Sequence, residues 1–233
     1  MLKVLDGGLL TTVQDRGRFG YRSYGIPQTG AMDDLAFEIG NILVGNYNNA
    51  AVLEFTQLAG SYQFLDERVF CLAGADFNFK LNNNPLETYT TYLSKKGDIL
   101  SAEYPKEGIR SYLCISGGID IPMIMNSRST FLKGEFGGFD GRKIKKGDII
   151  KLFPSIIKNY KKIKFPHWLY IKYDKEIQIV LDKRTFKSSK IDIENLLNLN
   201  YNVSINIDRM GVRLEADIAL ADKTDILTEP TPV

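Results

Sequence analysis

Three clusters of arginine, glycine and acidic residues hold the side chains of this sequence that could bind or activate a ligand. The first is TTVQDRGRFGYRSYGIPQTGAMDD, residues 11–34, which shows neither a helix nor a strand pattern. Arginine binds carboxylates and phosphates through paired hydrogen bonds. Glycine lets backbone N–H groups come close to a ligand. The candidate side chains of this cluster are Gln14, Asp15, Arg16, Arg18 and Asp33.

The second cluster spans residues 116–148, and the third is NIDRMGVRLE, residues 206–215. SRST in the second cluster lacks the G-x-S-x-G nucleophile elbow, and no G-K-S/T follows GGFDG to make a phosphate-binding loop. Each cluster by itself also fits a structural role, in which an Asp–Arg pair pins a turn. The residues alone predict a concave site for a small anionic or amide-containing molecule. The further candidates are Gly117, Gly118, Arg128, Ser129, Gly137, Gly138, Arg142, Asp208 and Arg209.

Short strands are expected to hold these clusters in place. Runs of β-branched and aromatic residues recur between turn residues. One helix is predicted over residues 32–45, with acids in its first turn and Gly45 at its end, and a second over 190–199. Many strands with few helices predict a mainly β, barrel-like fold with a minor α+β component. The predicted strands are GSYQFL, RVFCLAGA, FNFKLN, DILSAEY, RSYLCIS, DIIKLF, EIQIVL and NVSINI, and NNNP and KKGD are predicted turns.

Two internal repeats bear on domain organisation. SKKGDILSAEY at 94–104 resembles KIKKGDIIKLF at 143–153, and QDRGRFGYR at 14–22 resembles IDRMGVRLE at 207–215 more weakly. Repeats are typical of a duplicated unit, although K-G-D is also simply a favourable hairpin turn. A lysine-rich stretch separates the halves, so we predict a first barrel over 1–153, a linker over 154–166 and the start of a second barrel over 167–233.

The composition excludes several classes of function. The chain has 233 residues, 44% hydrophobic and 25% charged, with a net charge of +2, which gives no reason to expect nucleic acid or a membrane as partner. The N-terminal sequence does not resemble a signal peptide, and we expect a cytoplasmic protein. Cys71 and Cys114 lie in apolar runs, which favours buried thiols over a disulfide or a metal pair. His167 is the one histidine, so a site that needs two histidines is excluded and no metal site is expected.

In this order the clusters resemble the biotin-dependent carboxyltransferase-like family. The family includes the C subunit of the bacterial ATP-dependent 5-oxoprolinase, a module associated with allophanate hydrolase, and part of the carboxyltransferase domain of urea carboxylase. The resemblance implies a cyclophilin-like β-barrel fold with two related halves, the second of them C-terminally truncated in this chain. The segments that carry it are TTVQDRGRFGYRSYGIPQTGAMDDLAF, GNILVGNYNNAAVLEFT, NSRSTFLKGEFGG and DRMGVRL.

The resemblance also implies a reaction and partners. The expected activity is the ATP-dependent opening of 5-oxo-L-proline to L-glutamate, by a hydrolase that works only together with the B and A subunits of 5-oxoprolinase. ATP with magnesium is expected at the level of the complex, and no biotin on this chain. Arg16, Arg18 and Arg128 would bind anionic groups. Gln14, Asp15 and Asp33 would orient the small amide, and Asp208 and Arg209 would contribute from the second barrel.

Two alternatives stay open at this point. The chain could transfer a carboxyl group to a small amide such as urea, with a biotinylated partner. It could also be a non-catalytic regulatory protein that binds the B-like subunit to antagonise a kinase inhibitor.

Overall fold

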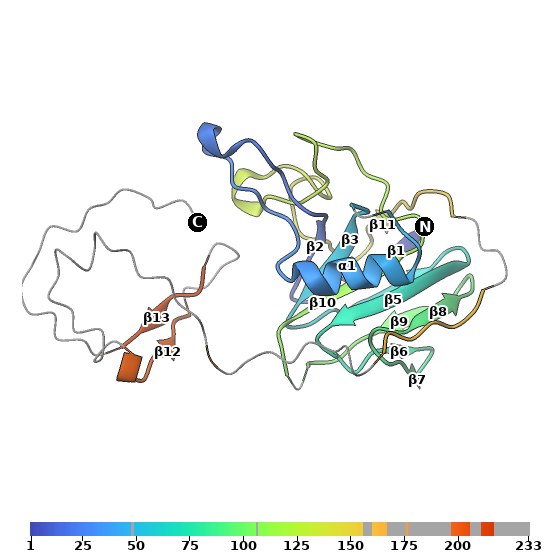
Figure 1. The fold of residues 1–233 in the computed structure, drawn as a ribbon. Helices are drawn as coiled ribbons and strands as arrows, with labels where there is room; N and C mark the ends of the chain where they lie inside the picture. The colour runs from blue at the N-terminus through green and yellow to red at the C-terminus, as the bar shows by residue number, and fades with distance from the viewer. Residues whose placement is uncertain are drawn as a thin grey trace, which may run out of the picture. The chain divides into compact units, whose positions relative to one another are not determined.

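The computed structural model describes residues 1–47, 49–105, 107–155, 160–166, 176, 197–205 and 211–216 (Figure 1). The chain divides into two compact units, Met1–Tyr170 and Ile171–Val233. His167, the predicted strand EIQIVL, most of the helix predicted at 190–199, and both Asp208 and Arg209 lie outside the described residues. Within the described part of the chain, none of the helices has the length and apolar character needed to cross a membrane.

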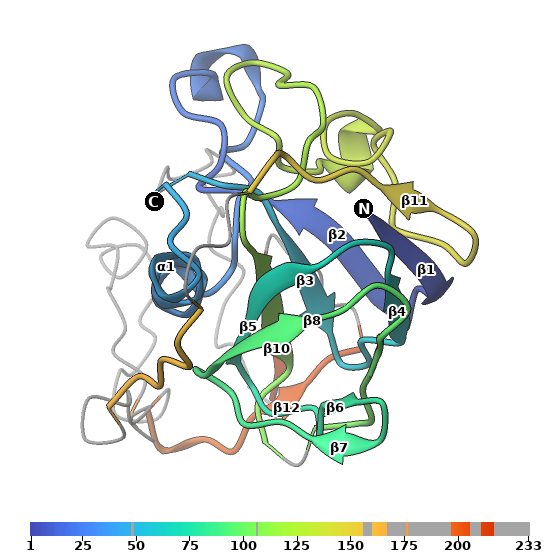
Figure 2. The same cartoon turned by 90° about the vertical axis from the view of Figure 1, so that its right-hand side faces the viewer.

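Two antiparallel sheets build the first unit (Figures 1 and 2). One has the strand order β11-β1-β4-β9-β6-β7 and the other β2-β3-β10-β5-β8. The mainly β prediction is therefore confirmed, while the strands of the described residues pair into two open sheets, not one closed barrel. The strands are β1 Leu2–Asp6, β2 Leu10–Gln14, β3 Val52–Thr56, β4 Ser61–Phe64, β5 Arg68–Gly74, β6 Lys80–Leu81, β7 Asn84–Pro85, β8 Thr91–Ser94, β9 Ile99–Ser101, β10 Arg110–Ile115 and β11 Ile149–Ile150.

The main core lies where the two sheets face each other. Side chains of a strand alternate between its faces, so Val13, Leu53 and Leu113, which are partners across β2, β3 and β10, share one face and are fully buried. Phe55 of the same face stacks on Tyr62 of β4, with ring centroids 5.5 Å apart. Aromatic contacts of this kind add to the stabilisation from burial itself, so this core fixes the sheets against each other.

Helix α1, Asp34–Leu43, covers the other face of the five-stranded sheet (Figure 2). Asp33 caps it, because its Oδ1 accepts a hydrogen bond from the Ala36 N–H at 2.9 Å. Phe37 packs edge-on against Tyr112 of β10, with ring centroids 6.4 Å apart. The helix predicted over 32–45 is thus confirmed. Cys71 and Cys114 lie beneath it as buried free thiols, as predicted.

The stronger sequence repeat forms the same turn twice within one sheet. Asp98 accepts a hydrogen bond from the Lys95 N–H at 2.8 Å, and Asp148 accepts one from the Lys145 N–H at 2.8 Å. The strands that follow, β9 and β11, pair with β4 and β1. Both copies therefore lie in the first unit, and this repeat does not relate the two units.

Residues 160–166 run along β8 at the edge of the five-stranded sheet. The Thr91 N–H donates to the Ile163 carbonyl at 2.8 Å, and the Phe165 N–H donates to the Tyr89 carbonyl at 2.9 Å. This part of the predicted linker is thus bound to the first unit. In the second unit the described strands are β12, Asn202–Val203, and β13, Leu214–Glu215, which pair antiparallel. The domain boundaries and the second barrel stay predictions.

Candidate functional site

The first cluster contains a strand and a projecting loop. Strand β2 continues through Gln14, so the prediction that residues 11–14 have no regular structure is wrong. The chain then leaves the sheet as a loop, residues 16–31, which we call the arm. It carries a 3₁₀ helix, Arg22–Tyr24, and returns where the Ala31 N–H donates to the Asp15 carbonyl at 2.9 Å. Figures 1 and 2 show the arm beside the loops that follow β10, at one end of the sheets.

The carboxylate of Asp15 ties the base of the arm to the segment around residue 128. Its Oδ1 accepts hydrogen bonds from the Gly17 N–H at 2.9 Å, from Ser127 Oγ at 2.7 Å and from Ser129 Oγ. Its Oδ2 accepts one from the Arg128 N–H at 2.6 Å. Asp15 has no exposed surface. The carboxylate therefore holds two distant segments together, and the chain itself occupies its acceptor positions.

Arg18 is the buried positive charge beside this carboxylate. Its guanidinium donates to the Ile124 carbonyl at 3.1 Å, to Thr29 Oγ1 at 3.0 Å and to the Ser129 carbonyl at 2.9 Å. It also lies 4.9 Å from the centroid of the Phe136 ring. Burial lowers the pKa of Arg18, and the charge of Asp15 opposes that shift. Arg18 thus joins the arm to the loops after β10.

Gly137 and Gly138 pack against the same segment. A side-chain carbon at position 137 would lie 2.2 Å from the Ser129 carbonyl oxygen, and one at position 138 would lie 1.8 Å from Thr130 Oγ1. The Thr130 hydroxyl donates to the Val13 carbonyl of β2 at 2.9 Å. These glycines, predicted to bind ligand, allow a close approach of one loop to another.

Gly138→Ala is expected to lower the free energy of unfolding by about 2–4 kcal/mol. The added methyl group would overlap Thr130, and the residue has a φ of +56°. Gly147→Ala is the matched control: its φ is +94° but no atom lies within 4 Å of the added carbon, so backbone strain of about 1 kcal/mol is expected. Urea denaturation measures the loss in free energy of unfolding for both variants. Equal losses would show that close packing is not the reason why position 138 needs glycine.

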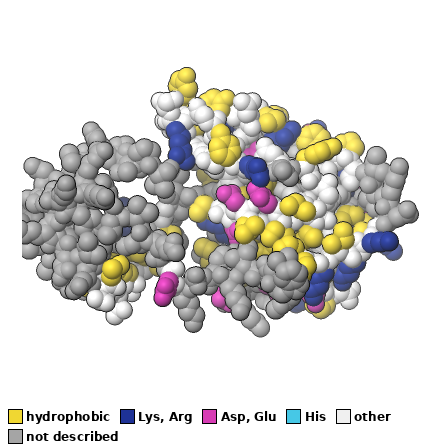
Figure 3. All heavy atoms as spheres, viewed as in Figure 1, with side chains coloured by type: hydrophobic (Ala, Val, Ile, Leu, Met, Phe, Trp, Pro, Cys, Tyr) yellow, Lys and Arg dark blue, Asp and Glu magenta, His cyan; other side chains and the backbone are white. Residues whose placement is uncertain are grey.

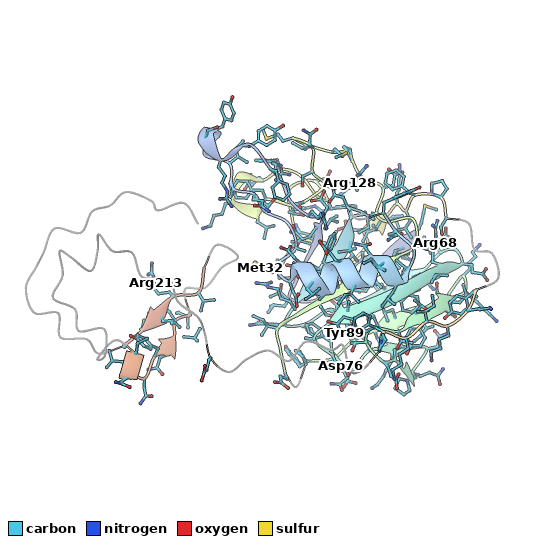
Figure 4. All side chains as sticks on the ribbon, viewed as in Figure 1. Met32, Arg68, Asp76, Tyr89, Arg128 and Arg213 are labelled. Carbon is cyan, nitrogen blue, oxygen red and sulfur yellow. The ribbon has the colours of Figure 1, made fainter. Side chains whose placement is uncertain are left out.

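Arg128 and Arg16 are two of the predicted arginines that reach the surface. Arg128 donates from Nε to the Ile121 carbonyl at 2.9 Å, and its guanidinium lies 5.1 Å from the centroid of the Phe153 ring. Its two terminal amino groups make no hydrogen bond with the described residues, so the half-buried cation can bind an anion. Figure 4 labels it above α1. Arg16 pairs instead with Glu38 of α1 at the surface.

Three other predicted residues have different surroundings. Arg142 binds Asp148 through two hydrogen bonds of 2.8 and 2.9 Å, which raises the pKa of Arg142 and lowers that of Asp148. Gly117 and Gly118 form the turn after β10, where the Gly117 N–H donates to Asn46 Oδ1 at 2.8 Å. Arg142 therefore stabilises the turn before β11, and Gly117 and Gly118 shape the turn after β10.

A row of buried polar side chains crosses the helix-covered face of the five-stranded sheet. Thr12, Glu54 and Tyr112 are partners across β2, β3 and β10 and therefore share this face. Gln14 donates to Thr12 Oγ1 at 2.9 Å, while its Oε1 is buried and accepts no hydrogen bond from the described residues. Figure 4 shows Met32, which begins the segment bound to this row, at one end of α1.

Glu54 is the centre of this row, and the sequence interpretation missed it. Its Oε2 accepts hydrogen bonds from the Met32 N–H at 2.9 Å and the Tyr112 hydroxyl at 3.0 Å. The Tyr112 hydroxyl in turn accepts from the Asp33 N–H at 2.7 Å. Burial, and then the charge of Glu54, raise the pKa of Tyr112, which therefore stays a neutral donor. The sequence feature that could have indicated this role is that Glu54 is a single acid within the apolar run AAVLEF.

A hollow of about 390 Å³ lies in the arm, within the size range of small-molecule sites. Arginine, serine and glutamine side chains around it suit a ligand with a carboxylate or an amide. The hollow is lined by Arg18, Phe19, Gly20, Arg22, Ser23 and Gln28.

The contacts described above bring seven of the predicted site residues together around the base of the arm: Gln14, Asp15, Arg18, Arg128, Ser129, Gly137 and Gly138.

The chain belongs to the family described as carboxyltransferase domain, subdomain A and B, whose model matches residues 24–233. Among curated relatives, the C subunit of 5-oxoprolinase from Escherichia coli (strain K12) is 44% identical over 155 residues, 66% of this chain, and that from Haemophilus influenzae is 40% identical over 64% of this chain. The chain spans about half the length of these relatives, 50% and 48%. The predicted resemblance is confirmed.

A solved structure shows the same fold. The Kluyveromyces lactis urea carboxylase superposes with a TM-score of 0.84 and 32% identity over 92% of this chain and 20% of that chain. The urea amidolyase of Saccharomyces cerevisiae is a more distant relative, 33% identical over 89% of this chain and 12% of its own length. Some of these relatives are thus named as subunits of 5-oxoprolinase, and others as urea carboxylase or urea amidolyase.

Proposed function

We propose that the chain works as one subunit of an ATP-dependent 5-oxoprolinase, which opens 5-oxo-L-proline to L-glutamate together with the B and A subunits. The observation that carries this proposal is the 44% identity over 155 residues to a 5-oxoprolinase component, against 38% over 151 residues to a urea amidolyase. We also infer that the two sheets correspond to a cyclophilin-like barrel.

The chemistry explains which groups the site must supply. A lactam is a poor electrophile, and ATP would make it a better one by phosphorylating the amide oxygen. The sequence has no G-K-S/T phosphate-binding loop. We propose that ATP and magnesium act at the level of the complex of the three subunits.

This chain would bind and orient the substrate. Negative charge on the substrate requires cations and N–H donors that are already in position. Arg128 offers two amino groups without partners among the described residues, and the arm offers Arg22 and Gln28 around its hollow. Asp15 and Arg18 hold these segments in place instead of touching substrate. Gln14 and Asp33 lie at the row of buried polar side chains under α1, and from there they would orient the small amide.

The second candidate is carboxyl transfer to a small amide. The family description and the 0.84 TM-score to a urea carboxylase favour it. Such a reaction needs a biotinylated partner, since we assign no biotin to this chain.

One assay separates the candidates. The purified chain is mixed with the homologues of the B and A subunits from the same genome, ATP and 5-oxo-L-proline, and glutamate is measured. ATP-dependent glutamate formation supports the 5-oxoprolinase. Turnover that requires bicarbonate and a biotinylated protein would support carboxyl transfer instead. Binding to the B subunit without any turnover would indicate a regulatory protein.

Arg128→Ala is expected to lower kcat/KM for glutamate formation by roughly 100-fold or more, because it removes a positioned cation. The fold should persist, since the side chain of Arg128 makes a single hydrogen bond to the described residues, at the Ile121 carbonyl. Lys80→Ala is the control, a surface lysine paired with Glu103, and should leave the rate unchanged. Full activity of Arg128→Ala, with an unchanged circular dichroism spectrum, would remove Arg128 from the site.

A further inference from the structure

Large apolar side chains are exposed on two neighbouring loops at the end of the first unit. Tyr24 and Phe19 of the arm are 78% and 62% exposed, and Met123 of the next loop is 48% exposed. Figures 1 and 2 show the two loops side by side, and Figure 3 shows hydrophobic side chains on this end of the unit. We call the loop face the set Phe19, Tyr24, Met123, Ile124 and Met125.

The two loops are fastened to each other from inside. Arg18 in the arm donates to the Ile124 carbonyl at 3.1 Å, and the carboxylate of Asp15 binds both segments. Asn126 also donates to the Tyr21 hydroxyl at 3.5 Å. The loop face is therefore formed before any partner arrives, which reduces the entropy lost on binding.

Met125 is an unexpected residue for its position. Ile124 and Ser127 pair across a two-residue turn in which Met125 and Asn126 have φ values of +52° and +60°. Turns of this type favour asparagine or glycine, because other side chains are strained at positive φ. The chain instead places a 38% exposed methionine there. Methionine does not favour the conformation of this turn, so folding does not explain its presence. A contact between its exposed side chain and an apolar partner would explain it.

The two loops that carry the loop face are basic. Between Asp15 and Asp33 the arm has no acid, and of its three arginines Arg18 is buried, Arg16 pairs with Glu38 of α1, and Arg22 lies in the 3₁₀ helix that also carries Tyr24. The other loop contains Arg128 and Lys133 and no acid between residues 121 and 134. A second copy of this chain would bring like charges together across a two-fold contact. An apolar patch bordered by carboxylates would match this face.

We propose that the loop face docks a protein partner that presents an apolar patch bordered by carboxylates. The proposal rests on the proposed function, under which that partner is the B subunit of 5-oxoprolinase. Because Phe19 also lines the hollow of the arm, a partner bound here would lie over the hollow and exclude water from it. Docking would then complete the substrate site at the interface.

The experiment measures the affinity of the full chain for the purified B subunit homologue of the same genome. Met125→Asn suits the turn and removes the apolar tip, and Tyr24→Ser removes the most exposed ring of the arm. The double variant should weaken Kd by at least roughly 30-fold, with a melting temperature equal to or above that of the wild type, because asparagine suits the turn at position 125. Tyr47→Ser is the matched control, since Tyr47 is 94% exposed after α1, and should leave Kd essentially unchanged. Raising the salt concentration should weaken binding of the wild type.

The outcomes separate the docking surface from the function. Glutamate formation by the double variant should recover when the B subunit is in excess, whereas Arg128→Ala should not recover. If the double variant binds the B subunit like the wild type while the complex makes glutamate, the loop face is wrong and the function stands. If the B subunit does not bind and no glutamate forms, both fail. Self-association of the wild type that the double variant abolishes would assign the face to a second copy.

Discussion

Asp15→Asn is expected to lower the free energy of unfolding by about 3–5 kcal/mol, because a charged acceptor is lost from four buried hydrogen bonds and a hydrogen bond to a charged group contributes about 1.5–3 kcal/mol. The carboxylate accepts hydrogen bonds from two backbone N–H groups and two hydroxyls, with no exposed surface. An asparagine amide would turn its NH₂ group toward donors and leave the charge of Arg18 without its neighbour. Urea denaturation followed by circular dichroism measures the loss.

The control for Asp15 is Glu103→Gln, which removes a surface charge paired with Lys80. An exposed pair of this kind contributes about 1 kcal/mol or less. Hydrogen exchange should show the Asp15 variant opening first in the arm and in residues 121–130. If Asp15→Asn unfolds like the wild type but is inactive in the glutamate assay, Asp15 touches substrate, as the sequence predicted, and does not mainly hold the loops.

Glu54→Gln is expected to lower the free energy of unfolding by about 3 kcal/mol and to loosen the start of α1. Glu54 is 1% exposed and lies 3.4 Å from Arg110, which is itself mostly buried. The variant removes the charge opposite Arg110 and turns an amide toward the Met32 N–H or the Tyr112 hydroxyl, both of which donate. Denaturation gives the size of the loss, and hydrogen exchange over residues 32–43 gives its location.

Glu38→Gln is the matched control on the same helix. Glu38 pairs with Arg16 at the surface, and its side chain is 37% exposed, so a loss of about 1 kcal/mol or less is expected. Equal exchange at the start of α1 in both variants would contradict the role assigned to Glu54.

Much of the architecture could be read from local sequence patterns. Strand runs such as RVFCLAGA and RSYLCIS follow from short apolar and aromatic runs, and the helix from Asp34 to Leu43 follows from helical spacing, each within a few residues. Strand β2 was missed because its buried residues Thr11, Thr12 and Gln14 are polar, so no apolar run marks the strand. Sheet order depends on pairings far apart in the chain, which local patterns do not encode.

The candidate site, too, could be predicted only in part from local sequence patterns. The family, the mainly β class and the residue types gathered at the site could all be recognised before folding, because they are properties of composition, spacing and motif. The role of each side chain depends on long-range packing. Asp15 and Arg18 look like free catalytic groups in the sequence, but they bind partners more than 100 residues away and have little capacity left for a ligand. Glu54 looks like an ordinary strand residue, and the helix packed over it makes it a buried charge.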